Sequence, residues 1–550
     1  PADPQHLVDY FNNLTHTGTA TIVSDVVTGP GAGVPAARIL TFKLEVMAGA
    51  TTAFIFPFAV TPSTITTPNS AWDLEVTLRP VDPQDCPNEE LLGTAVLPWQ
   101  EPFIVIRGSK SISQLVQAGV LPNPVLIDRS VVLIPAAGST APPTLTIDVP
   151  SFSFIASGSA NDFLLSRGAT ILVENGSTLS INGMDVQGCT ALARGIVVES
   201  GAILNLTGGT IIRDCHTGVD AAPGAHLTSV GTSFNNNVTG INLDMASVPV
   251  GSRRLATLNL SGNTFDGSSL LPPSLAPVGN QGYCGINLNF YEHFNVYGGN
   301  TFRNMANGLV AYHSIMNIGN MTFTNILTRG TGPYPHQGFG IHLEGEFWGF
   351  AWANINELWT TMTFTNCETG IWGDIYPGKV ENTTMNTLFD GISWQTSIDM
   401  SLHFRENRIT TGRFGIRSFI NEPLRGGLGI SRNTINITGA STVRTLSGID
   451  MQEGGFVLPN RTGWSVTRNN ISMSKGGNGI NYRNGAMGRI FANPLITNGD
   501  RRFMYSGIRI QDSKNTIISA NSIGQSNTLG FGISRGLESS GGTANIFSCN

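Results

Sequence analysis

Two carboxylates, a histidine, a tryptophan and a tyrosine stand at matching positions of three neighbouring repeats. His342 and Trp372 stand two residues after the glycine of a glycine–aliphatic pair, and Tyr312, Glu344 and Asp374 stand four residues after it. If the repeats stack in register, these side chains share one outer face. Acid–base chemistry on a sugar needs two ionisable groups near one bond, and this set supplies them. We therefore name Glu344, Asp374 and His342 as candidate catalytic residues.

Aromatic residues gather around the same repeats. Five of the eight tryptophans lie between positions 348 and 394, namely Trp348, Trp352, Trp359, Trp372 and Trp394. Indole and phenol rings stack on the apolar faces of sugars, so we name as candidate ligand-binding residues Trp372, Tyr312, Trp348, Trp352 and Tyr376. The same rings could instead pack as a small inserted core against the repeats. Packing, binding and catalysis remain open at this point.

The repeat itself is a glycine followed by an aliphatic residue. It occurs thirteen times from Gly195-Ile196 to Gly532-Ile533, at intervals of 21 to 45 residues, and segments such as GNTFRN (299–304) lie between the pairs. The short alternating runs are separated by Gly, Asn and Asp and show no helical period. Strands of three to five residues at this spacing predict a parallel β-helix. Each turn would bury one aliphatic side chain and pair with its neighbours about 4.8 Å away.

These pairs resemble those of right-handed parallel β-helix proteins of the pectate-lyase-like superfamily, over about residues 165–549. The run TILVENGSTLSINGMDVQGC (170–189) is also similar to β-helix regions of large secreted bacterial surface proteins. The resemblance implies the fold and leaves function open, because this scaffold carries enzymes, spikes and adhesins. Members resembling polygalacturonase carry Asn-x-Asp, Asp-Asp, Gly-His-Gly and Arg-x-Lys on consecutive turns. The last three motifs are absent here.

The first 150 residues lack the glycine–aliphatic pairs and are rich in proline. Runs such as ILTFKLEVMA (39–48), WDLEVTLRP (72–80) and PFIVIRG (102–108) alternate as strands do. We predict that residues 1–150 form a β-sandwich-like module that caps the solenoid, with one short helix within 110–120. Its end, residues 135–150, is predicted to be a Pro/Thr-rich linker. Residues 151–550 are then predicted to form the β-helix, which we expect to continue beyond the last residue.

Composition excludes several classes of protein. Charged residues make up only 12% of the chain and the formal net charge is −6. No basic run is present, which argues against nucleic-acid binding, and the longest apolar run, residues 53–60, is too short to span a membrane. Acidic residues are spread thinly, so we predict neither a metal site nor a cofactor, although Ca²⁺ serves some proteins of this fold.

Two cysteines occupy matching positions of successive repeats. Aligning GMDVQGC (183–189) with GTIIRDC (209–215) puts Cys189 beside Cys215, within disulfide range if the turns stack. The alternative is a pair of buried, stacked thiols.

Three functional hypotheses follow. The first is an extracellular structural or adhesive β-solenoid segment of a large surface protein or appendage, which binds cell-surface glycans and itself, as a homo-oligomer or filament. The second is a polysaccharide lyase or glycoside hydrolase with a cleft near residues 334–376. The third is a phage-type receptor-binding spike. An open groove with exposed carboxylates favours the enzyme, and a filled aromatic cluster favours the first hypothesis.

Overall fold

The computed structural model describes most of the chain after residue 102 and a hairpin before it. The described residues are 18–28, 37–46, 103–121, 126–127, 130–156, 162–189, 192–268, 283–328, 336–345, 351–396, 401–420, 427–440, 446–453, 464–485, 488–497, 505–525, 534–543 and 545–548.

The chain divides into two compact units, residues 1–104 and 105–550. In the first, β1 (Gly18–Thr28) and β2 (Ala37–Val46) form an antiparallel pair, which overlaps the expected strand at 39–48. The expected strand at 72–80, and with it most of the predicted sandwich, lies outside the described residues.

The predicted boundary at residue 150 is wrong. The run at 102–108 forms β3 (Phe103–Arg107), which pairs in the sheet with β6 (Ser130–Ile134). The predicted linker contains β7 (Thr144–Ile147), which pairs in parallel with β10 (Thr170–Val173). Prolines in this segment stand in turns between strands and do not mark a domain boundary. The solenoid therefore begins near residue 103.

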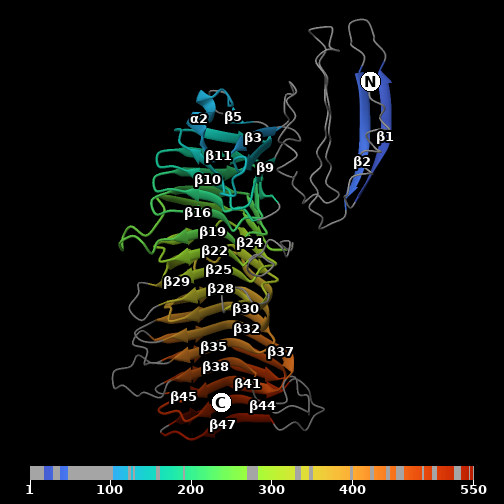
Figure 1. The fold of residues 1–550 in the computed structure, drawn as a ribbon. Helices are drawn as coiled ribbons and strands as arrows, with labels where there is room; N and C mark the ends of the chain where they lie inside the picture. Colours follow the sequence, from blue (N-terminus) through green and yellow to red (C-terminus); the bar gives the residue numbers. More distant parts are fainter. Residues whose placement is uncertain are drawn as a thin grey trace, which may run out of the picture. The chain divides into compact units, whose positions relative to one another are not determined.

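The solenoid is a right-handed parallel β-helix (Figure 1). We label the three faces of the helix as sheets A, B and C; in each turn the chain passes through sheet A, then sheet C, then sheet B. One turn runs through β10 on sheet A, β11 (Thr178–Asn182) on sheet C and β12 (Asp185–Gly188) on sheet B, and returns to sheet A at β13 (Gly195–Val198). Each strand pairs in parallel with the equivalent strands of adjacent turns. β30 (Met362–Asp374) and β32 (Thr384–Thr396) run through the corner from sheet B into sheet A.

The remaining strands follow the same order. Sheet A continues with β16 (Thr217–Ala221), β19 (Thr239–Asp244), β22 (Cys284–Asn289), β25 (Asn307–Tyr312), β28 (Phe339–Glu344), β35 (Phe414–Ile420), β38 (Ser447–Glu453), β41 (Gly477–Arg483), β44 (Tyr505–Gln511) and β47 (Ser534–Ser540). Sheet B contains β9 (Asp162–Leu165), β15 (Ile211–Arg213), β18 (Ser233–Asn235), β21 (Thr264–Asp266), β24 (Asn300–Arg303), β27 (Met321–Thr324), β34 (Arg408–Thr411), β37 (Thr434–Ala440), β40 (Asn470–Lys475), β43 (Pro494–Thr497) and β46 (Ser522–Gln525). Sheet C is in two parts, which are linked between β20 and β23 only by an isolated bridge from Ser261 to Gly298. The first part contains, with β11, the strands β5 (Leu126–Ile127), β8 (Phe152–Ile155), β14 (Ile203–Thr207), β17 (His226–Val230) and β20 (Thr257–Ser261). The second part contains β23 (Phe294–Val296), β26 (Ile315–Ile318), β29 (Trp352–Ile355), β31 (Gly378–Glu381), β33 (Leu402–Arg405), β36 (Leu428–Ser431), β39 (Ser465–Thr467), β42 (Arg489–Phe491), β45 (Ile517–Ser519) and β48 (Ile546–Ser548).

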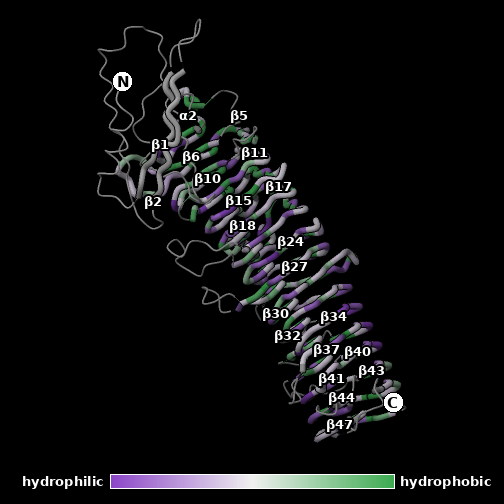
Figure 2. Tube along the Cα trace, turned by 90° about the vertical axis from the view of Figure 1, so that its right-hand side faces the viewer, coloured by the Kyte–Doolittle hydropathy of each residue, from purple (hydrophilic) through white to green (hydrophobic). Residues whose placement is uncertain are grey.

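The glycine–aliphatic pairs lie on sheet A, as the sequence predicts. Their aliphatic members point inward and are fully buried from Ile196 to Ile508, and Figure 2 shows polar and apolar positions alternating along the turns. The glycine is required because a Cβ on Gly240 would lie 2.7 Å from the Phe265 ring and 2.5 Å from the next turn's carbonyl. The last expected pair is wrong: Ile508 pairs with Leu537, so Gly536-Leu537 continues the row in place of Gly532-Ile533.

A short helix stands at the N-terminal end of the solenoid. α2 (Ile112–Gln117) follows β4 (Lys110–Ser111) and begins with a capping box between Ser111 and Gln114. It lies within the segment where the sequence predicts a helix. Its apolar side chains Ile112 and Leu115 are buried, so residues of the solenoid unit itself cover inward-facing groups at this end (Figure 1).

Candidate functional site

The predicted outward rows on sheet A are confirmed by strand pairing. His342 pairs with Val310 on one side and Trp372 on the other, and the row continues to Ser393 and Arg417. Two residues further on, the second row runs from Tyr312 through Glu344 and Asp374. The structure therefore brings together five of the predicted residues, from strands β25, β28 and β30.

Aromatic rings surround His342, whose exposed fraction is only 1%. Its ring lies 4.7 Å from that of Trp372, edge to face, and 5.9 Å from that of Tyr312. His336 precedes β28 and Phe339 begins it, and both rings contact His342 and stack on Trp372, at 5.5 and 5.6 Å with interplanar angles of 19° and 25°. We call His336, Phe339, His342 and Trp372 the aromatic cluster. His342 is thus covered, although its row faces outward.

The imidazole of His342 is held neutral. Burial, and to a lesser extent the charge on His336, lowers its pKa to about 3. Among the described residues neither ring nitrogen has a hydrogen-bond partner, and Glu344 Oε2 lies 3.8 Å from Nε2, too far for a hydrogen bond. A buried polar group of this kind costs stability, which marks the cluster as more than ordinary packing.

The two carboxylates differ in environment. The side chain of Glu344 is 41% exposed. Asp374 is partly buried, and burial together with the neighbouring charge of Glu344 raises the pKa of its carboxyl group. In the described part of the chain, Asp374 Oδ1 has no hydrogen-bond partner. The edge of the cluster therefore carries one solvated carboxylate beside one that protonates more readily.

Other predicted ligand-binding residues lie elsewhere. The prediction that Tyr376 binds a ligand at the surface is wrong, because its side chain is fully buried. Burial raises the pKa of its phenol, and its hydroxyl accepts from the backbone N–H of Ser314 and donates to the Ser314 carbonyl. Trp352 begins β29 on sheet C, where its Nε1 donates to Asn354 Oδ1 at 2.7 Å. Trp348 lies outside the described residues. The tryptophans therefore do not form one surface.

Sequence reasoning missed Phe339 and the inward direction of Trp394. Phe339 stands just before the Gly340-Ile341 pair, where the matching residues of the next two turns are Thr369 and Asp390. Its departure from that polar pattern was the available signal. Trp394 is 1% exposed and donates its Nε1–H to the carbonyl of Tyr376 at 2.7 Å.

The predicted Cys189–Cys215 disulfide is wrong. The register of β12 and β15 agrees with the alignment, since Val186 pairs with Ile212. Beyond these strands the turns differ in length, and Cys215 lies beside Ala193 as a free, buried thiol. Cys189 is disulfide-bonded, but not to Cys215.

Within the described residues, no group of three or more His, Cys, Asp or Glu side chains is arranged to hold a metal ion. A search of the same residues finds no helix with the length and apolar character needed to cross a membrane.

Comparison with known proteins gives two structural likenesses. No family model and no curated protein matches the chain. Two solved structures, both of the periplasmic alginate epimerase AlgG (one a point mutant), are 12% identical with a TM-score of 0.21. Each match covers 80% of this chain, together with 84% of the first AlgG chain and 85% of the mutant AlgG chain. The strand pairing itself carries the fold assignment. By that pairing, the chain is a right-handed parallel β-helix protein.

Proposed function

We propose that this chain is an extracellular structural or adhesive β-solenoid that binds glycans through the aromatic cluster on sheet A. The observation that carries the proposal is the setting of Trp372. Its aromatic partners in the described residues all come from the turn of β28, whereas the next side chain along the row is the small Ser393. An indole supported on one side and followed by a hydroxyl is suited to stack on a pyranose ring.

The polar groups around the ring fit the same ligand. Glu344 and Asp374 offer carboxylate oxygens to sugar hydroxyls at the edge of the cluster. The imidazole of His342, whose nitrogens have no hydrogen-bond partner among the described residues, packs edge to face with the Trp372 ring at 4.7 Å. A filled cluster, rather than an open groove between carboxylates, supports binding over turnover.

The disulfide at Cys189 supports an extracellular setting, because disulfides persist in oxidising compartments.

A carbohydrate-active enzyme is the second candidate. The observation that favours it is the raised pKa of Asp374 beside Glu344, because a proton-donating carboxyl next to an ionised one is a pattern used in glycoside cleavage. Under this alternative, Glu344→Gln and Asp374→Asn each abolish depolymerisation of a polysaccharide and leave its binding intact.

A glycan array followed by affinity electrophoresis tests the proposal. Wild type should be retained by at least one glycan, Trp372→Ala should lose retention, and Trp352→Ala on sheet C is the matched control that should keep it. Equal retention of Trp372→Ala and wild type would reject the platform. Release of reducing ends or unsaturated products from a polysaccharide panel would favour the enzyme instead.

A further inference from the structure

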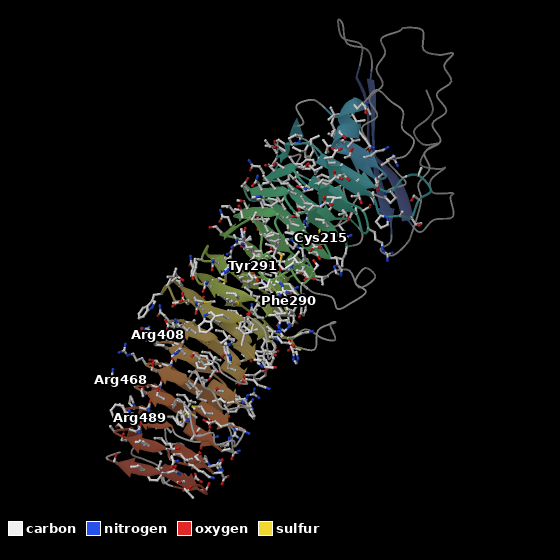
Figure 3. All side chains as sticks on the ribbon, turned by 90° about the vertical axis from the view of Figure 1, so that its left-hand side faces the viewer. Cys215, Phe290, Tyr291, Arg408, Arg468 and Arg489 are labelled. Carbon is white, nitrogen blue, oxygen red and sulfur yellow. The ribbon has the colours of Figure 1, made fainter. Side chains whose placement is uncertain are left out.

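A second surface lies at the corner where the chain passes from sheet C to sheet B, on the side of the solenoid away from sheet A. Four arginines line it over three successive turns, one or two to a turn: Arg405, Arg408, Arg432 and Arg468. We call this row the arginine ridge. Figure 3 shows Arg408 and Arg468 along one edge of the solenoid; Arg489, also labelled there, begins β42 on sheet C and is not part of this row.

A buried asparagine ladder fixes the ridge from inside. Asn407, Asn433 and Asn469 are at most 1% exposed, and the backbone N–H and Nδ2 of each donate to Oδ1 of the next asparagine in the ladder. The residue before each ladder asparagine has a positive φ, and two of these are Arg432 (56°) and Arg468 (57°). The ladder therefore sets the backbone of the ridge turn by turn.

The ridge has more positive charge than its neighbours neutralise. Glu406 Oε1 accepts from both Arg405 and Arg432 at 3.0 Å. Among the described residues, Arg408 and Arg468 form no ion pair, and both are exposed. Four cations against two carboxylates, Glu406 and Glu381, the strand partner of Arg405 on the preceding turn, leave an excess of positive charge that makes a local site for an anion.

Exposed aromatic rings stand at both ends of the ridge. Trp359 is 53% exposed, and the guanidinium of Arg405 lies 5.8 Å from its ring centroid. At the other end Phe491, on the same strand as Arg489, is 37% exposed. Stacking surfaces beside unpaired guanidinium groups are the combination that binds a charged sugar: rings take the apolar faces and arginines take the anionic groups.

We infer that the arginine ridge binds a linear polyanionic glycan, with carboxylate or sulfate groups, along the solenoid axis. The ridge is narrow, follows the axis and advances about 4.8 Å per turn, a spacing similar to the length of one sugar unit in an extended chain. A single-file row of this kind fits a linear polymer. The site uses none of the residues of the aromatic cluster, so the two proposals fail independently.

The test compares two triple variants that change net charge equally. The ridge variant is Arg408→Gln, Arg432→Gln and Arg468→Gln. The control is Arg167→Gln, Arg194→Gln and Lys514→Gln, three exposed cations at other corners for which the described residues show no ion pair. Binding is measured by titration with heparin (sulfated), hyaluronan (carboxylated), neutral dextran and duplex DNA at several salt concentrations, with melting temperatures checked first.

Wild type should bind heparin or hyaluronan, which separates sulfate from carboxylate recognition, and should ignore dextran. The ridge variant should bind at least about tenfold more weakly, with the salt slope reduced by about one for each arginine removed. The control should match wild type. Trp359→Ala should also weaken binding, whereas Trp372→Ala should not.

Three results would overturn the inference: no binding of wild type to either glycan, equal loss in both triple variants, or duplex DNA bound as tightly as the glycans. If Trp372→Ala loses binding and the ridge variant binds as wild type does, the glycan binds at the aromatic cluster on sheet A and not at the ridge.

Discussion

The two surfaces of sheet A between β28 and β32 carry similar residues in opposite states. On the inner side, Trp394 and, just beyond the end of β30, Tyr376 are buried with their polar atoms bonded to backbone. On the outer surface, His342 is equally buried and has no hydrogen-bond partner among the described residues, and Trp372 is only partly covered. The inner arrangement stabilises the fold. The outer one costs stability and leaves a ring available, which is what a binding site requires.

The largest expected effect comes from charging the inner surface. Ile371 is fully buried in the aliphatic row, so Ile371→Asp places an unpaired carboxylate in the core at a cost of several kcal/mol. We expect loss of cooperative unfolding or a large fall in melting temperature, measured by circular dichroism. Ser393→Asp, outward on the next turn, should melt close to wild type. A normal melting curve for Ile371→Asp would show that the register is wrong.

The next effect concerns the inner tryptophan. Trp394→Ala removes a buried ring that packs 5.5 Å from Phe404 and should cost about 3–5 kcal/mol of unfolding free energy. Denaturant titration measures this loss. A change below about 1 kcal/mol would mean that the inner surface is no better packed than the outer one.

A smaller, pH-dependent effect belongs to His342. Because its folded pKa is about 3 and the unfolded value is 6.5, the unfolded chain binds a proton that the folded chain refuses. Above pH 6.5 the imidazole is neutral in both states, so His342 does not change the free energy of unfolding. As the pH drops from 6.5 towards 3, the unfolded state gains protons and the free energy of unfolding falls. By pH 4.5 the loss is about 2–3 kcal/mol.

His342→Phe should remove that dependence. The raised pKa values of Asp374 and Asp214 act in the opposite direction, so the difference between variant and wild type is the quantity to measure. His216→Gln, an exposed histidine, serves as the control. Parallel stability–pH profiles for His342→Phe and wild type would contradict the burial of a neutral imidazole.

Strand positions and outward rows were predictable because a period in the sequence becomes a register in space. The pairs of Glu344 with Asp374 and His342 with Trp372 follow directly from the spacing of the glycines. Turns break this logic, since their lengths vary. The turn that follows Cys189 brings Ala193, and not Cys189, beside Cys215. The spacing of the repeats does not predict this difference.

Direction of side chains beyond the strands was equally hidden. Tyr376 follows the left-handed residue Ile375 (φ 51°), which turns the chain so that the tyrosine enters the core. The composition of residues 103–150 also obscured the first turns, because their prolines lie between strands that still pair in parallel. The arginine ridge depends on the corner conformation before each ladder asparagine and was not predicted as a binding site.

The most direct test measures glycan affinity and unfolding free energy on one variant, Trp372→Ala. The account predicts that glycan retention is lost while the unfolding free energy stays within about 1 kcal/mol of wild type, because the ring lies on the outer surface. Unchanged retention, or a loss of about 3–5 kcal/mol as for a core ring, would contradict it.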